Sequence, residues 1–411
     1  MSKTRSNKIT VVALMQRALE VPGILSLAAG FTDNDLLPCA EVRSIVANIL
    51  VDPQVLQYSN PPGRQGLRSA ICNDIMASDR ACGADPGLLE ASEVVVTNGS
   101  QQALYIMIQA LCQPGDVVLV ESPTYFVFLD LLDVLGIRAI GMPAKDDRLD
   151  LDRLGDFFND LRSKGMLEKV RAVYAVSYFS NPSGLSLERE QKVGLVRMMQ
   201  SYDLRVPILE DIAYREMYFD KPWPAPTLLE AYSANTPLVL TGTFTKNFST
   251  GLKVGYLWAR DAKLRERVLD IKRAMDFGTS NFSQAIIEHA ISEGIYARFL
   301  ERMRAVYDHK CEVLHDALIR HGLHELGWRW ERSCGGLYLW LTAPKGVETT
   351  ADSKFFDVCI EEKILYVPGD LCFVTGGENK VRLSFGYLEE ESLPEGAERF
   401  VRAAARLATA R

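Results

Sequence analysis

Short apolar runs alternate with amphipathic segments between residues 60 and about 290. The apolar runs predict buried strands, which we place at Glu93–Thr97, Val117–Val120, Ala139–Met142, Val170–Val176, Pro207–Leu209 and Leu238–Thr241. Helical periodicity lies between them, at Leu67–Asp79, Ser100–Leu111, Phe126–Leu135 and Glu188–Tyr202. Strands that are apolar on both faces and are separated by helices indicate a mostly parallel sheet covered on both sides. The pattern therefore predicts an α/β domain.

The pattern changes after about residue 290. It predicts a long charged helix at Ile295–His321 and a shorter one near Lys354–Glu362, with the strand-like segments GGLYLWL, ILYVPG and KVRLSFG between and after them. Mixed strands and helices with hairpin-like spacing suggest a second, α+β lobe. Near the N-terminus we predict an amphipathic helix at Ile9–Leu19 and another helix after Pro38. We expect three parts: an N-terminal segment (1–55) that packs on the small domain, a large α/β domain (56–290) and a small C-terminal α+β domain (291–411).

The composition narrows the class of protein. With 411 residues, of which 47% are hydrophobic and 24% charged, the chain has the proportions of a globular protein and the length for two domains. Its formal charge of −7 and its pI near 5.5 come without the basic stripe that a nucleic-acid footprint needs. We therefore expect a small-molecule site and no nucleic-acid partner.

Cysteine and histidine usage bears on metals and on the compartment. Eight cysteines are scattered without a C-x-x-C pair, which indicates neither a zinc cluster nor a disulfide framework. His321 and His324 lie three residues apart, without a nearby carboxylate pattern of metal type, and are expected to be solvated. The N-terminal apolar run is broken by Gln16 and Arg17, unlike a signal peptide, and no segment approaches the ~20 apolar residues of a membrane span. We expect reduced thiols, no metal, no membrane association and a cytoplasmic location.

Polar residues follow the predicted strands, where open parallel sheets bind their ligands. The loop Asn98–Gln101 opens a helix and could either hold an anion or simply cap the helix. Tyr125 could be a stacking platform or a core residue, and Asn181 could be ordinary turn chemistry. Asp211 ends an apolar strand and needs a positive partner, which could be a cofactor nitrogen or an arginine in a core ion pair.

The stretch Leu240–Trp258, LTGTFTKNFSTGLKVGYLW, carries a candidate nucleophile. Lys246 lies among hydroxyl side chains at the inner end of an apolar strand, where a desolvated amine could form a Schiff base. The alternative is an ordinary solvated lysine in a polar loop. The segment by itself does not decide between the two.

Eight of these segments together resemble a known family. TNGSQQAL, ESPTY, NPSG, EDIAY, TFTKNFSTGLKVGY, GGLYLWL, VPG and KVRLSFG occur in the order and spacing of the class I/II aminotransferases, pyridoxal-phosphate enzymes of fold type I. The resemblance covers nearly the whole chain and is closest to the α-aminoadipate and kynurenine-type subgroup. It implies a mostly parallel sheet sandwiched by helices with a smaller C-terminal lobe, pyridoxal 5′-phosphate as cofactor, an L-amino acid substrate and a homodimer.

The resemblance also implies a role for each polar loop. Lys246 would form the Schiff base and move the proton at Cα, and Asp211 would keep the pyridine nitrogen protonated, so that the ring accepts the carbanion's electrons. Asn181 and Tyr214 would hydrogen-bond the phenolic oxygen, and Tyr125 would stack on the ring. The phosphate would be held by Gly99, Ser100, Gln101, Thr243, Thr245 and Lys253, with Tyr58 reaching in from the partner subunit.

The same resemblance places the substrate. Arg382, in KVRLSFG, would clamp the α-carboxylate with its planar fork. Asn181, Gly30 and Phe31 would complete the substrate-binding set. The catalytic residues would then be Lys246, Asp211 and Tyr214.

Three departures from the family pattern affect the predicted reaction. Lys253 stands where this subgroup usually has an arginine, and an ammonium lacks the fork that matches a phosphate. Ser180 stands where glutamine is expected, and Tyr178 and Phe179 are bulky neighbours. Transamination is the leading hypothesis. One alternative is another pyridoxal-phosphate reaction of a natural-product pathway, such as β- or γ-elimination or replacement, cyclisation or oxidation. The other is a non-catalytic amino-acid-sensing module fused to a DNA-binding domain, for which the segment ISLAAGFTD arrives too early.

Overall fold

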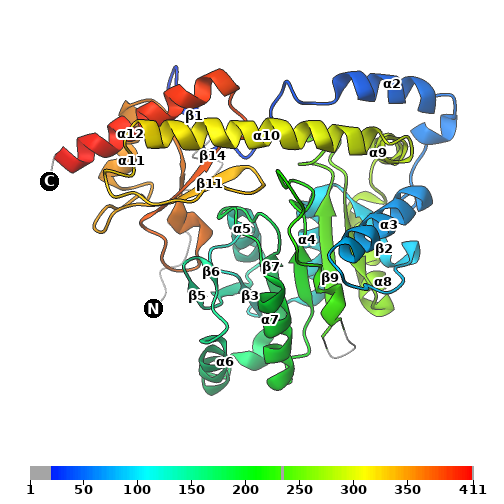
Figure 1. The fold of residues 1–411 in the computed structure, drawn as a ribbon. Coiled ribbons are helices and arrows are strands. Elements are labelled where there is room, and N and C mark those ends of the chain that lie inside the picture. The colour runs from blue at the N-terminus through cyan, green and yellow to red at the C-terminus, as the bar shows by residue number, and fades with distance from the viewer. Residues whose placement is uncertain (1–19, 233–235, 410–411) are drawn as a thin grey trace.

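A seven-stranded sheet forms the centre of the larger part of the molecule. In the computed structural model, which describes residues 20–232 and 236–409, its strand order is β2-β10-β9-β8-β7-β3-β4 (Figure 1). The strands are β2 (Val94–Thr97), β3 (Val117–Val120), β4 (Arg138–Gly141), β7 (Val170–Val176), β8 (Ile208–Asp211), β9 (Leu238–Thr243) and β10 (Gly255–Ala259). All neighbours pair in parallel except β10, which is antiparallel to both β2 and β9. The predicted α/β class with a mostly parallel sheet is confirmed.

Burial on both faces explains why these segments are strands. Every residue of β2, β3, β8 and β9 is buried, which suits continuous apolar and β-branched runs. All six predicted strands form, with ends shifted by no more than two residues. The seventh, β10, was not predicted. It follows β9 after an irregular loop, a connection that an antiparallel neighbour permits and a parallel one does not.

Helices precede, separate and follow these strands along the chain. They are α3 (Gln65–Ala81), α4 (Gly99–Leu111), α5 (Phe126–Val134), α6 (Leu154–Ser163), α7 (Arg189–Ser201), α8 (Ala262–Asp276) and α9 (Asn281–Ser292). The four predicted helices are α3, α4, α5 and α7, again within two residues at each end. Helix α4 packs across β9 and β10 and against α8. The helices α6 and α9 and the hairpin of β5 (Ala144–Lys145) and β6 (Arg148–Leu149) were not predicted.

A second group of elements forms the C-terminal lobe. Its sheet has the order β11-β14-β13, built from β11 (Tyr338–Thr342), β14 (Lys380–Ser384) and β13 (Val367–Pro368), and its helices are α11 (Lys354–Glu361) and α12 (Leu393–Thr409). The long helix α10 (Ile295–Arg320) contacts α9 and α12 and so runs along both groups (Figure 1). The predicted charged helix, GGLYLWL strand and KVRLSFG strand are thereby confirmed.

The N-terminal segment contacts both groups. Strand β1 (Leu25–Ser26) pairs in parallel with β12 (Ile364–Leu365), whereas α2 (Cys39–Ile49) packs on α9. The domain limits at residues 55 and 290 stay a prediction. The predicted helix Ile9–Leu19 lies outside the described residues.

Short 3₁₀ helices complete the described chain. They are η2 (Pro53–Leu56), η3 (Ala91–Glu93), η4 (Leu167–Lys169), η5 (Leu228–Ala231), η6 (Gly369–Cys372) and η7 (Glu390–Ser392). Among the described helices, none has both the length and the apolar composition that crossing a bilayer requires.

Candidate active site

A cavity of about 170 Å³ opens at the carboxyl ends of β7, β8 and β9. Loops far apart in sequence meet there because parallel strands end at the same edge of the sheet. The predicted cofactor-binding residues that line it are Gly99, Ser100, Gln101, Tyr125, Asn181, Asp211, Tyr214, Thr243, Thr245, Lys246 and Lys253. Four further residues, which were not predicted as ligands, are Asn98, Tyr174, Val176 and Ala213. Of the predicted cofactor-binding set, only Tyr58 is missing from the lining.

Lys246 reaches this cavity from the loop after β9. The Thr245 amide donates to the Thr243 hydroxyl oxygen (3.1 Å) and fixes the turn that carries the lysine. Lys246 Nζ donates to the carbonyl oxygen of Gly30 at 2.5 Å. Gly30, predicted to bind substrate, therefore lies beside the predicted Schiff-base lysine although 216 positions separate them in the chain.

The surroundings of Lys246 favour its neutral form. Burial lowers the pKa of its ammonium below the usual value, and the nearby charges of Arg382 and Lys253 lower it further, against an opposing contribution from Tyr338. A lowered pKa increases the fraction of unprotonated amine, which is the form that attacks a carbonyl carbon. Burial of this kind does not fit the alternative interpretation, in which Lys246 is an ordinary solvated lysine.

Asp211 ends β8 at the floor of the cavity and is 4% exposed. Its Oδ1 accepts from the Ala213 amide (2.9 Å) and its Oδ2 from the Tyr174 hydroxyl (3.1 Å). Burial raises the pKa of Asp211 to about 6, although both hydrogen bonds act in the opposite direction. The described chain gives this carboxyl two neutral donors and no ion-pair partner, so the core ion pair with an arginine, the alternative for Asp211, is not formed there.

The first turn of α4 forms another wall of the cavity. Its N-cap residue, Asn98, makes no side-chain cap, and its amide group donates instead to Asp276 Oδ2 (2.8 Å). The backbone N–H groups at this helix start are therefore open to an external anion. Gly99 has a φ of 75°, and a Cβ there would lie 3.4 Å from the Thr245 hydroxyl, so the absence of a side chain keeps this corner accessible. Lys253 adds a positive charge to the same cavity.

Arg382 in β14 lies against the Asn181 side of the site and is 1% exposed. One terminal nitrogen donates to Asn181 Oδ1 (2.7 Å) and the other to the Ala28 carbonyl oxygen (2.6 Å). Its Nε is buried and has no hydrogen-bond partner within the described part of the chain. The guanidinium lies 4.3 Å from the ring centre of Tyr338 and 5.2 Å from that of Phe126.

Two predicted residues do not reach this arrangement within the chain. Tyr58 is 83% exposed, and its ring meets the edge of Phe277 at 5.8 Å. Phe31 is 53% exposed and contacts Tyr387 edge-on at 5.5 Å. Neither lines the cavity.

Two tyrosines that were not predicted support the site. Tyr174 bonds Asp211 from the neighbouring strand β7, and the Tyr338 hydroxyl lies 3.2 Å from the hydroxyl of Tyr214. Burial raises the pKa of the Tyr174 and Tyr214 phenols well above the usual value, so both stay protonated. The sequence gives no signal for Tyr174, because its contact depends on the pairing of β7 with β8.

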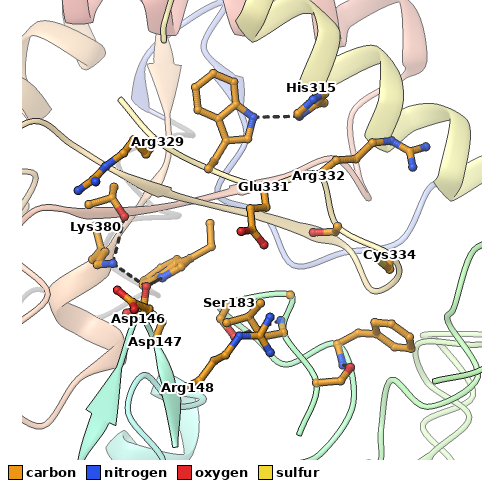
Figure 2. Close-up of a pocket in the computed structure, with 18 of the residues that line it drawn as sticks. Asp146, Asp147, Arg148, Ser183, His315, Arg329, Glu331, Arg332, Cys334 and Lys380 are labelled. Carbon is orange, nitrogen blue, oxygen red and sulfur yellow. Dashed lines mark hydrogen bonds and ion pairs between the residues drawn. The ribbon is translucent and has the colours of Figure 1, made fainter. Parts of the chain in front are cut away.

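A larger groove of about 830 Å³ lies outside this cavity, between the β5–β6 hairpin and the segment from Arg329 to Cys334 (Figure 2). Its Lys380 donates to Asp147 (2.5 Å) and to the Thr342 hydroxyl (3.0 Å), and so ties the two sides together. None of the predicted cofactor or catalytic residues lines the groove. Within the described chain, no cluster of three or more His, Cys, Asp or Glu side chains could hold a metal ion.

Comparison with known proteins shows the family of this chain. The family model "Aminotransferase class I and II" matches residues 22–400. A 2-aminoadipate transaminase of Thermus thermophilus is 33% identical over 387 residues, 93% of this chain and 90% of that protein. LysN, an α-aminoadipate aminotransferase of the same organism solved with N-(5′-phosphopyridoxyl)-L-leucine, superposes with a TM-score of 0.80 at 30% identity and covers 97% of this chain and 96% of its own. The uncharacterized HTH-type regulator YisV of Bacillus subtilis is 26% identical and covers 98% of this chain, but only 78% of the regulator is matched.

The chain therefore belongs to the class I and II aminotransferase family, as its sequence motifs indicated. Its fold is that of fold type I, and its reaction class is pyridoxal-phosphate-dependent transamination. The two alternatives, another pyridoxal-phosphate reaction and a sensing module, are not favoured.

Proposed function

We propose that this chain moves the amino group of an L-α-amino acid to pyridoxal 5′-phosphate and then to a keto acid, with Lys246 as the Schiff-base residue. One observation carries the proposal: a single cavity brings together an amine with a lowered pKa, a buried carboxyl and the open start of a helix, next to a buried arginine. These groups match the aldehyde, the pyridine nitrogen, the phosphate and the substrate carboxylate.

The residues present fit the cofactor. Asp211 is a buried acid without an ion-pair partner among the described residues, which a protonated ring nitrogen would supply. The first-turn amides of α4, the Thr243 and Thr245 hydroxyls and Lys253 would hold the phosphate. When bound, the cofactor supplies an electron sink for the substrate's Cα.

The other residues act on the substrate. Arg382, whose Nε is free of protein partners within the described chain, would bind the α-carboxylate. Lys246 Nζ would take the proton from Cα and deliver it to the carbon that was the aldehyde carbon of the cofactor, while Tyr125 covers one side of the ring. Asn181 and Tyr214 would hold the phenolic oxygen. Phe31, which follows Gly30 in the chain, would contact the side chain of the amino acid.

The proposed active form is a homodimer. Tyr58, Phe277, Leu56 and Val51 are 83%, 54%, 70% and 84% exposed, and two of them are in contact. The Tyr58–Phe277 contact joins two exposed rings, and contiguous exposed apolar surface is typical of an interface. Tyr58, which does not reach its own cavity, would serve the cavity of the partner subunit. A cytoplasmic location stays a prediction from the sequence.

Reductive trapping tests the lysine. The protein is incubated with pyridoxal 5′-phosphate, reduced with borohydride and digested, and the modified peptide is identified by mass spectrometry. We expect the label on Lys246 in the wild type and in Lys253→Ala, and none on that peptide in Lys246→Ala. A label on another lysine in the wild type would contradict the proposal.

A half-reaction tests the chemistry. The loaded protein is mixed, without a keto acid, with a panel that includes 2-aminoadipate, leucine, alanine and aromatic amino acids. Transamination predicts that the visible band of the bound cofactor is replaced by the ultraviolet band of the pyridoxamine form. Release of ammonia or consumption of oxygen would point instead to another pyridoxal-phosphate reaction, and no response to any amine would point to a sensing module.

A further inference from the structure

Tyr338 touches three parts of the candidate site at once. It begins β11 and is 1% exposed. Its hydroxyl lies 3.2 Å from that of Tyr214, and its ring lies under the Arg382 guanidinium, 4.3 Å from centre to carbon. A Cβ added to Gly30, whose carbonyl accepts from Lys246, would lie 3.2 Å from the Tyr338 hydroxyl.

The backbone fixes this position. Tyr338 pairs with Ser384 of β14, and Arg382 is two residues away on the same face of that strand. Diagonal neighbours across an antiparallel pair are within reach of an aromatic side chain. The Tyr338 carbonyl oxygen also accepts a hydrogen bond from the Ser333 hydroxyl (2.5 Å). The backbone at Tyr338 is therefore fixed by this bond as well as by its pairing with β14.

We propose that Tyr338 is a positioning residue of this active site, whose hydroxyl donates to Tyr214 and whose ring holds Arg382 in place. The inference rests on the proposed function, in which Tyr214 gives its proton to the phenolic oxygen of the cofactor. A hydroxyl has one proton, so Tyr214 can then only accept from Tyr338. A donor behind Tyr214 polarises its O–H bond and strengthens the bond that it makes in turn.

The two roles can be separated by substitution. Tyr338→Phe removes the hydroxyl and keeps the ring under Arg382, whereas Tyr338→Leu removes both. Phe126 provides a matched control because its ring also faces Arg382, at 5.2 Å, and it has no hydroxyl with which to bond Tyr214. Phe126→Leu therefore weakens the support of the guanidinium without removing a hydroxyl that bonds Tyr214.

The effect of the Tyr338 hydroxyl can be measured from the pH dependence of the visible absorption band of the bound cofactor. Stronger donation to the phenolic oxygen stabilises its anion and lowers the pH at which the Lys246 Schiff base loses its proton. We expect Tyr338→Phe to raise this midpoint by roughly 0.2 to 0.5 of a pH unit, which corresponds to a cooperative strengthening of about 10–30% of one bond. Phe126→Leu should leave the midpoint unchanged.

The effect of the Tyr338 ring on Arg382 can be measured from the KM for the amino acid. A cation–π contact between buried groups is worth about five- to thirtyfold in affinity. Tyr338→Leu and Phe126→Leu should therefore raise the KM for the amino acid by about that factor, whereas Tyr338→Phe should change it less than about twofold.

A double variant makes the hydroxyl test specific. If Tyr338 acts through Tyr214, Tyr338→Phe shifts the midpoint in the wild-type background and has no further effect in Tyr214→Phe. The role of the hydroxyl would be overturned if Tyr338→Phe left the midpoint unchanged or lowered it, or if the shift were equal in both backgrounds. The role of the ring would be overturned if Tyr338→Leu left the KM unchanged. If wild-type protein shows no visible band that borohydride traps on Lys246, the proposed function fails and this inference with it, so the two failures are distinguishable.

Discussion

Burial decides the protonation of Asp211, and this makes the stability of the cofactor-free protein depend on pH. The pKa of Asp211 is raised to about 6 in the folded chain, against about 4 for an unfolded aspartate. The folded state then binds the proton more tightly than the unfolded state, so the free energy of unfolding falls as pH rises from about 4 to about 6 and stays lower above that. Two pKa units correspond to about 3 kcal/mol.

We predict that Asp211→Asn removes this pH-dependent loss of the free energy of unfolding, because asparagine does not titrate. In the protein without cofactor, the stability of the variant relative to the wild type should rise by up to about 3 kcal/mol between pH 4 and pH 7, as measured by urea denaturation at each pH. Asp152→Asn, at an exposed position, is the matched control and should follow the wild type throughout. A difference between Asp211→Asn and the wild type that does not vary with pH would contradict the prediction.

In our proposal, Lys253 supplies the cationic side chain that meets the phosphate in the cavity, at a position where the resemblance led us to expect an arginine. It is exposed and has a φ of 55°. A charge-assisted hydrogen bond is worth about 1.5–3 kcal/mol, and solvent exposure places Lys253 at the lower end. Lys253→Ala should therefore raise the Kd for pyridoxal 5′-phosphate by about tenfold without changing the circular dichroism spectrum, whereas Lys253→Arg should bind at least as well as the wild type. Equal cofactor retention by Lys253→Ala after dialysis would show that the ammonium does not hold the phosphate.

At the scale of elements, β10 supports the proposed phosphate site, although none of its residues is among the proposed ligands. Gly255 begins this strand, directly below the first turn of α4. A Cβ at Gly255 would lie 2.5 Å from the carbonyl carbon of Gly99 and 2.6 Å from the Ser100 nitrogen. These are backbone atoms, so the helix start would have to move.

Gly255→Ala should therefore displace the backbone amides that we propose bind the phosphate. We expect a Kd for pyridoxal 5′-phosphate raised by more than about tenfold and a stability loss of about 1–3 kcal/mol, the usual cost of overpacking. The matched control is Gly251→Ala, where an added Cβ would have nothing within 4 Å; it should change neither quantity by more than the error of a titration. Tight cofactor binding by Gly255→Ala would show that α4 can shift without loss of the site.

The parallel strands and their helices could be predicted from the sequence because their apolar runs are continuous. Val117–Val120 and Val170–Val176 were predicted with the bounds that the structure has. The strand β10 could not be, since KVGYLW is short, contains a glycine and follows a loop without a crossover helix. The same limit applies to the site. Motifs led to the residues after each strand, but Tyr174 and Tyr338 act across strand pairs, and contacts of that kind depend on register, which a single sequence does not give.

At the scale of the whole molecule, the site joins three separate parts of the chain. The segment around Ala28 and Gly30 accepts hydrogen bonds from Arg382 and Lys246, and Arg382 in turn bonds Asn181. The N-terminal segment, the large sheet and the C-terminal lobe are thus linked through the groups that would bind the substrate. A substrate carboxylate bound to Arg382 would replace these hydrogen bonds or add to them. Substrate binding would therefore change the contacts that join all three parts.

Tyr58 is the predicted cofactor-binding residue that does not line the cavity of its own chain. In our proposal the complete site therefore lies between two subunits, and hybrid dimers made from two inactive variants can test this. In the proposed dimer, Tyr58→Ala and Lys246→Ala should each inactivate both sites of their own dimers. In a hybrid dimer, the site that contains Lys246 from the Tyr58→Ala subunit receives an intact Tyr58 from the Lys246→Ala subunit. Unfolding and refolding an equal mixture should then restore about a quarter of the wild-type activity, since half of the dimers are hybrids with one good site each. If Tyr58 served its own subunit, no hybrid site would hold both residues, and the refolded mixture would stay as inactive as its parents.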